Sequence, residues 1–131
     1  MTMLLSRADV ERLLTPEACI AAVEDAFRRL AEGKVPSPGI LGMHAGDGSF
    51  HVKASFLTLD RPYFAAKLNA NFPQNGKRHG LPTIQGVVIL CDAANGAPLA
   101  VMDSMAIPHC EQRLRRRSRP CTWRPSIATP R

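Results

Sequence analysis

The chain changes character abruptly after Ile107. Residues 1–107 contain ten basic and ten acidic residues, so this part carries no net formal charge. The last 24 residues contain seven arginines and one acid, Glu111, and they hold the whole formal charge of +6. Arginines and prolines at this density leave no apolar face for a helix or a strand. We therefore expect one folded domain over residues 1–107 and a disordered tail over residues 108–131.

Length and composition exclude several classes of protein. A chain of 131 residues with 45% hydrophobic residues can bury one ordinary core, but it has no room for a separate cofactor domain. No apolar run approaches the roughly 18 to 20 residues that span a bilayer, and the N-terminus becomes charged too early for a secretory signal. Cys19 and Cys91 lie in periodic segments and are interpreted as small apolar residues. We expect a cytoplasmic protein without a membrane partner.

The first third of the chain predicts two helices. Apolar residues at helical spacing follow Ser6, a favourable N-cap, and predict a short helix up to residue 14. Thr15, Pro16 and Glu17 then supply an N-cap, a proline at the first helical position and an acid in the first turn. Spacings of three and four continue to Gly33, which predicts a second helix of about 17 residues.

The rest of the domain predicts strands joined by turns. Residues 40–44 predict an edge strand, and further strands are expected over residues 49–59, 63–71, 81–91 and 98–102. The continuous apolar run over residues 87–90 predicts burial on both faces, and residues 72–80 predict a long polar loop. The expected fold is α+β: two N-terminal helices, then a mainly antiparallel or mixed sheet of about five strands.

Four blocks, in this order, resemble the ornithine cyclodeaminase/mu-crystallin family. They are residues 50–54 (FHVKA), 63–73 (YFAAKLNANFP), 80–86 (GLPTIQG) and 92–103 (DAANGAPLAVMD). The likeness covers residues 1–107. It implies an N-terminal domain for substrate binding and dimerisation, which in the family precedes a Rossmann domain. It also implies NAD(P)-dependent chemistry on amino acids or imines, as in ornithine cyclodeaminases, alanine dehydrogenases and ketimine reductases.

The resemblance also implies roles for three residues. Lys67 matches the lysine that binds the substrate carboxylate, Lys53 is a weaker candidate for the same site, and Thr83 matches a position near the cofactor. Without the motif, a strand lysine would be interpreted as a solvated residue. Many members carry an arginine in the segment that aligns with residues 35–40, and this chain has none there. This departure argues against ornithine itself as the substrate.

The Rossmann half of the family is missing from this sequence. No GxGxxG motif occurs, and the acidic catalytic residue of the family belongs to the missing half. We therefore expect no retained catalytic residue, no NAD(P) binding and no turnover by this chain alone. The family continues with a segment resembling Ile-Thr-x-Leu-Arg-Thr-Ala-Ala, and back-translation of residues 108–131 in another frame allows that segment. One base lost after the Ile107 codon would explain the tail as a frameshift product.

Two other classes of protein remain open. The arginine-rich tail and Trp123 could bind nucleic acid, although the neutral domain carries no motif for it, so such binding is expected only incidentally. The domain could instead be a non-catalytic dimerisation module that forms a homodimer through its sheet. The four histidines and the cysteines lack the spacing of a zinc site, so no metal is expected.

Overall fold

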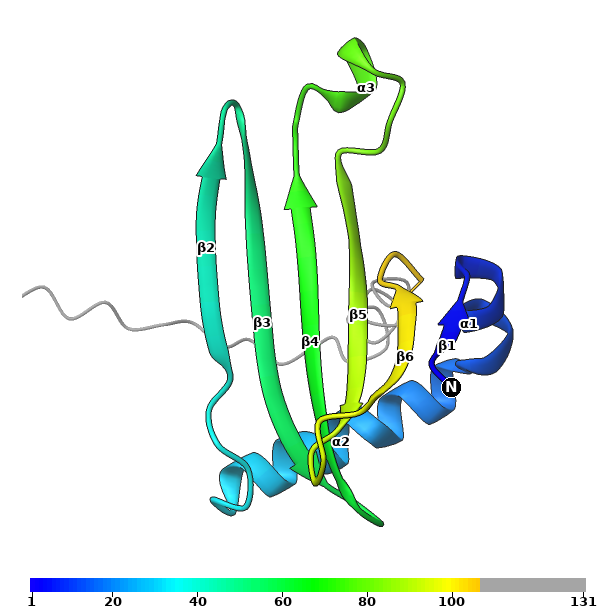
Figure 1. Ribbon diagram of the computed structural model, residues 1–131, viewed down its shortest axis with the longest axis vertical. Coiled ribbons are helices and arrows are strands. Elements are labelled where there is room, and N and C mark those ends of the chain that lie inside the picture. The colour runs from blue at the N-terminus through cyan, green and yellow to red at the C-terminus, as the bar shows by residue number, and fades with distance from the viewer. Residues whose placement is uncertain (107–131) are drawn as a thin grey trace, which may run out of the picture.

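A computed structural model of the protein describes residues 1–106, which form three helices and one mixed sheet (Figure 1). The elements are β1 (Met3–Leu5), α1 (Arg7–Leu13), α2 (Pro16–Ala31), β2 (Gly39–Ala45), β3 (Gly48–Thr58), β4 (Pro62–Asn71), α3 (Asn75–Arg78), β5 (Ile84–Asp92) and β6 (Pro98–Asp103). The strand order is β1-β6-β5-β4-β3-β2. Among the strands of residues 1–106 only β1 and β6 pair in parallel, so the predicted α+β class and the largely antiparallel sheet are confirmed.

Both long helices begin at the predicted caps. Ser6 and Asp9 form a capping box at the start of α1, in which each side chain accepts a hydrogen bond from the backbone N–H of the other residue. The hydrogen bonds from Ser6, together with the Arg12 guanidinium, hold the pKa of Asp9 below its usual value. The Thr15 hydroxyl accepts from the Ala18 N–H at 3.2 Å, with proline at the first helical position of α2.

The sheet is built from long hairpins. β3 and β4 pair over ten residues each, from Ser49 opposite Asn71 to Thr58 opposite Pro62. Gly96, in the Asn-Gly turn between β5 and β6, has φ of 76°, a left-handed conformation that glycine adopts at little cost. The strands predicted from residue 40 onward all form, with ends shifted by up to three residues.

The sheet has six strands, one more than the five or so expected, because β1 adds alongside β6, with Met3 opposite Ala100. Two other expectations from the sequence are wrong. The predicted loop over residues 72–80 contains the short helix α3, from which Arg78 forms an ion pair with Asp47 at 2.6 Å. The run over residues 87–90 is not buried on both faces, since Ile89 is 38% exposed. The predicted tail over residues 108–131 lies outside the described residues.

Within residues 1–106, only one face of the sheet is covered by a helix. α2 crosses one end of that face (Figure 1), and the Arg29 guanidinium on α2 donates to the Thr58 carbonyl at the end of β3. Side chains along β2 to β5 alternate between this covered face and the opposite face, which we call the open face. Its exposed large apolar side chains are Leu41, Met43, Phe50, Phe56, Phe64, Leu68 and Ile89.

Gly86, in β5, is a position where a side chain has no room. A Cβ there would overlap the Leu68 carbonyl oxygen and would lie 2.7 Å from Ser104 Oγ. Because a backbone oxygen of the central strand β4 cannot give way, we expect Gly86→Ala to lower the free energy of unfolding by about 1 to 3 kcal/mol. Denaturant unfolding would measure this change.

Gly39→Ala is the matched control for this substitution. Gly39 is also a strand glycine, but its nearest contact would be the Ala54 carbonyl at 3.7 Å, an ordinary distance. We expect its free energy of unfolding to change by less than about 0.5 kcal/mol. Equal effects of the two substitutions would contradict the packing described around Gly86.

Candidate functional site

Two lysines lie directly opposite each other on the face of the sheet that carries α2. Lys53 on β3 pairs with Lys67 on β4. Directly opposite residues in an antiparallel pair have Cβ atoms roughly 4.5 to 5.5 Å apart, and like charges in such a pair are destabilising. The strand pairing therefore makes two cationic side chains direct neighbours, an arrangement that disfavours the fold.

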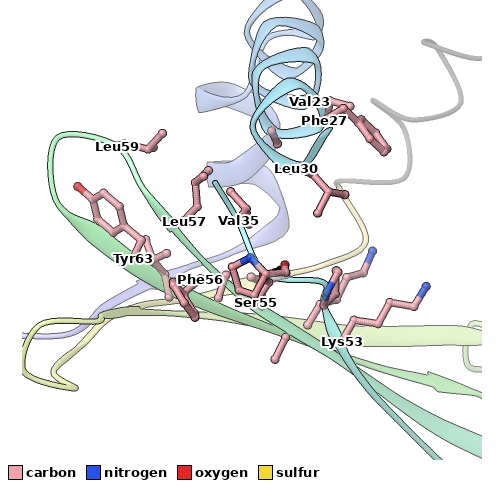
Figure 2. A pocket seen from close by; sticks show the side chains of 18 of the residues that line it. Val23, Phe27, Leu30, Val35, Lys53, Ser55, Phe56, Leu57, Leu59 and Tyr63 are labelled. Carbon is pink, nitrogen blue, oxygen red and sulfur yellow. Dashed lines mark hydrogen bonds between the residues drawn. The ribbon is translucent and has the colours of Figure 1, made fainter. Parts of the chain in front are cut away.

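Both lysines line a pocket of about 800 Å³ between α2 and the sheet. Figure 2 shows Phe27 and Leu30 on the helix above the strands, with Lys53 at one end of the pocket and Tyr63 at the other. Most of the lining side chains are apolar. They include Val23, Phe27, Leu30 and Val35 from the helical side, and Leu57, Val88 and Leu90 from the sheet. The pocket therefore combines an apolar wall with a small cationic floor, as many small-molecule sites do.

The positive charge of this floor is not neutralised by the described part of the chain. All six arginines of residues 1–106, and also Lys34, have a carboxylate oxygen within 4.0 Å. Lys53 and Lys67 have none among these residues, and the remaining lysine without one, Lys77, lies on α3. Asp60 is the one acid that lines the pocket, and its carboxylate accepts from the Tyr63 hydroxyl. Two cations beside apolar surface make a site that attracts an anion.

A polar cluster extends the site along the same face. Asn69 lies two residues beyond Lys67 on β4, and His51 lies opposite Asn69 on β3. The hydroxyl of Ser104, which is 1% exposed, donates to Asn69 Oδ1 at 3.2 Å, and the Ser104 N–H donates to the Gly86 carbonyl at 3.1 Å. Because its oxygen is held in this way, Asn69 presents its amide N–H groups as donors.

Sequence reasoning did not single out Asn69 or Ser104. Asn69 stands in a block that carries the family resemblance, which was a usable signal, since the polar residues in this block lie two apart. Ser104 follows the last block directly, and nothing in the sequence marks it as the partner of a residue 35 positions earlier. Contacts over such a separation depend on the pairing of the strands.

Thr83 does not join the two lysines. It precedes β5 and is exposed, and its carbonyl accepts from the Phe72 N–H at 2.8 Å. Val88 is the β5 residue opposite Lys67, and Thr83 lies five residues before it, roughly 17 Å along an extended strand. The structure thus brings together Lys53 and Lys67 of the three predicted site residues. The role of Thr83 near a cofactor stays a prediction.

The histidines and cysteines of residues 1–106 do not gather into a metal site. No group of three or more His, Cys, Asp or Glu side chains within this range could hold an ion. Cys19 is buried in α2 and Cys91 is half-buried in β5, in keeping with small apolar residues. His109, Cys110 and Cys121 lie outside the described residues. No helix of the described chain is long and apolar enough to cross a membrane.

Comparison with known proteins finds relatives of this chain in sequence and in structure. The alanine dehydrogenase of Archaeoglobus fulgidus is 33% identical over 103 residues, which are 79% of this chain and 31% of that protein. The structure of an archaeal alanine dehydrogenase dimer with bound NAD superposes with a TM-score of 0.76 at 31% identity, over 83% of this chain and 33% of that chain.

A second solved structure is also similar to this chain. The Δ1-pyrroline-2-carboxylate reductase of Thermococcus litoralis, in complex with NADH and L-proline, superposes with a TM-score of 0.71 at 35% identity, over 83% of this chain and 34% of that chain. The chain thus spans about a third of the length of these relatives. Residues 1–110 match the sequence profile of the ornithine cyclodeaminase/mu-crystallin family, and the chain belongs to that family.

Proposed function

We propose that this chain is the substrate-binding and dimerisation part of a cytoplasmic NAD(P)-dependent enzyme that acts on an amino acid or an imine. The observation that carries the proposal is the un-neutralised pair Lys53 and Lys67 on the floor of an apolar pocket. In a relative of alanine dehydrogenase, this is where a substrate carboxylate would be held. Lys67, whose match to the family lysine is the stronger one, is the principal ligand and Lys53 the second.

The chemistry of the pocket suits this role. A lysine ammonium on a long apolar stem can reach a carboxylate while its methylene groups remain against the pocket wall. The half-buried Lys67 lies beside apolar pocket side chains such as Val88, and such a low-dielectric wall strengthens the attraction between ammonium and carboxylate. A carboxylate held in this way fixes the position of the neighbouring α-carbon, which is the reacting atom in amino-acid oxidoreduction.

The described residues do not fit a nicotinamide cofactor. Within residues 1–106 no glycine-rich turn joins a strand to the N-terminus of a helix, the arrangement that cradles a pyrophosphate. We therefore derive no hydride transfer from this chain. We propose that the chain is a truncated member of the family, that residues 108–131 are a frameshift product, and that the chain has no turnover alone. In another frame the codons of His109 and Cys110 give Leu, and those of Cys110 and Glu111 allow Arg, which matches the Leu-Arg of the family segment and supports this proposal.

We also propose that a second copy of the chain covers the open face. Monomers rarely expose a contiguous apolar patch of more than a few hundred Å², and here Phe56 is 50% exposed, Leu41 55% and Met43 60%. A self-complementary patch on a flat sheet suits a two-fold dimer. The relative with the TM-score of 0.76 is described as a dimer, which supports this assignment.

The lysine pair yields a test of stability. If its like charges serve a ligand and not the fold, Lys67→Met relieves repulsion and raises the free energy of unfolding by up to about 1 kcal/mol at low salt. The gain shrinks as salt screens the charges. Lys77→Met is the matched control, since Lys77 also lacks a carboxylate partner but lies on α3. A loss of stability on Lys67→Met would contradict the repulsion.

The dimer is tested by placing a charge on the open face. We expect Leu68→Lys to convert the dimer to a monomer, because an ammonium would be buried without a partner in the centre of the interface. Leu13→Lys makes the same change at another exposed leucine, on α1, and should leave the dimer intact. Light scattering on the eluted peak distinguishes the two states. A Leu68→Lys protein that stays dimeric would rule out this interface.

Catalysis is tested by restoring the reading frame. One base inserted after the Ile107 codon should yield a longer protein with nicotinamide-dependent activity on an amino acid or imine, while the 131-residue chain forms no NADH. In the longer protein, Lys67→Ala should raise the KM for the substrate tenfold or more, with little effect on the KM for the cofactor. NADH formation by the 131-residue chain would overturn the proposed inactivity. An unchanged substrate KM would overturn the role of Lys67.

A further inference from the structure

We propose that the lysine pair selects a dicarboxylate: an amino or imino acid with a second carboxylate on its side chain. The inference rests on the proposed function, because it names the substrate class of the same pocket. Residues that lie opposite one another on β2, β3, β4 and β5 form a row across the sheet, and the row that contains the lysines is Ile40, Lys53, Lys67 and Val88. Two adjacent cations stand in this row between two apolar side chains.

Charge balance favours two carboxylates over one. Neither lysine has a carboxylate within 4.0 Å among residues 1–106, so a single carboxylate balances only one of the two positive charges. Lysine is a point charge and not a bidentate fork, so two lysines suit two separate anionic groups better than they suit one planar carboxylate. A dicarboxylate neutralises both charges.

The neighbouring row offers donors for a second carboxylate. It reads Gly42, His51, Asn69 and Gly86, with glycines on both sides of the two polar residues. The glycines accommodate these polar side chains: the His51 ring lies over Gly42, and Asn69 Oδ1 and Ser104 Oγ lie over Gly86. Ser104 holds Asn69 with its N–H groups available. The two rows together place two ammonium groups and further hydrogen-bond donors on one patch of the sheet.

The same charges disfavour a diamino acid. A cationic side chain would bring a third positive charge to the lysine pair. Asp60 is the acid that could attract such a side chain, but it lies in the turn between β3 and β4 and accepts from Tyr63. Tyr63 precedes Lys67 by four residues, roughly 13 Å along the strand, so Asp60 does not neutralise the lysines.

Binding of succinate and butyrate by the full 131-residue chain tests the inference. The two probes have the same number of carbons and differ by one carboxylate. Calorimetric titration at low salt should show succinate binding about tenfold more tightly than butyrate, and ornithine binding more weakly than succinate. Lys53→Met should reduce succinate affinity to the level of butyrate, Lys53→Arg should retain most of it, and Lys77→Met should change neither.

Three other outcomes of these titrations would overturn the dicarboxylate inference. Equal affinity for the two probes, with both lost on Lys67→Met, overturns the dicarboxylate inference and leaves the carboxylate site of the proposed function in place. Succinate binding that persists when both lysines are replaced by methionine would come from other charged groups. It would overturn both the dicarboxylate inference and the carboxylate site of the proposed function. Ornithine binding more tightly than succinate overturns the inference in favour of a diamino acid that uses Asp60.

Discussion

The pairing of β3 with β4 in one register is the constraint on which the rest of the structure depends. Side chains alternate between the two faces of a strand, so a shift of one residue would move every side chain of β3 to the other face. In the observed register Lys53 meets Lys67 beneath α2, while Phe56 meets Phe64 on the open face. The tight turn, in which the Leu59 N–H donates to the Arg61 carbonyl at 3.0 Å, joins the two strands at this register.

The two faces of the sheet therefore have different chemistry and different needs. The helix-bearing face has cations that lack anions and a pocket that α2 does not fill. The open face has aromatic and aliphatic side chains that lack a cover. Both features cost stability in the isolated chain. The partners that we propose, a small acid on one face and a second subunit on the other, would account for them. Proteins commonly accept such costs at functional sites.

Local signals in the sequence predicted local structure well. Ser6 and Thr15 cap their helices as predicted, and Asn95-Gly96 turns the chain between β5 and β6. Non-local structure was harder to predict. Strand β1 has three residues, too few for a periodic pattern, and it exists because β6 accepts it about 97 residues later. The apolar run over residues 87–90 of β5 predicted a strand buried on both faces, but Ile89 on the open face is exposed. An apolar run in a sequence does not show whether the same chain or another subunit covers it.

The candidate site was only partly predictable for the same reason. The resemblance to the family marked Lys67, and strand alternation placed Lys53 on one face or the other without deciding which. The register alone shows that they are direct neighbours. It also separates Thr83 from them, and it joins Ser104 to Asn69, a pair that no local pattern reveals. Long-range pairing thus determines the composition of the site, while the sequence supplies its candidate residues.

The central claim is that Lys53 and Lys67 jointly bind the carboxylate groups of one ligand. Competitive acetylation of the full chain, read by mass spectrometry with and without a saturating dicarboxylate, tests this claim most directly. We expect the ligand to slow the modification of Lys53 and Lys67 together, by a similar factor, and to leave Lys34 and Lys77 unchanged. Slowing at neither lysine of the pair, or equal slowing at all four, would contradict it.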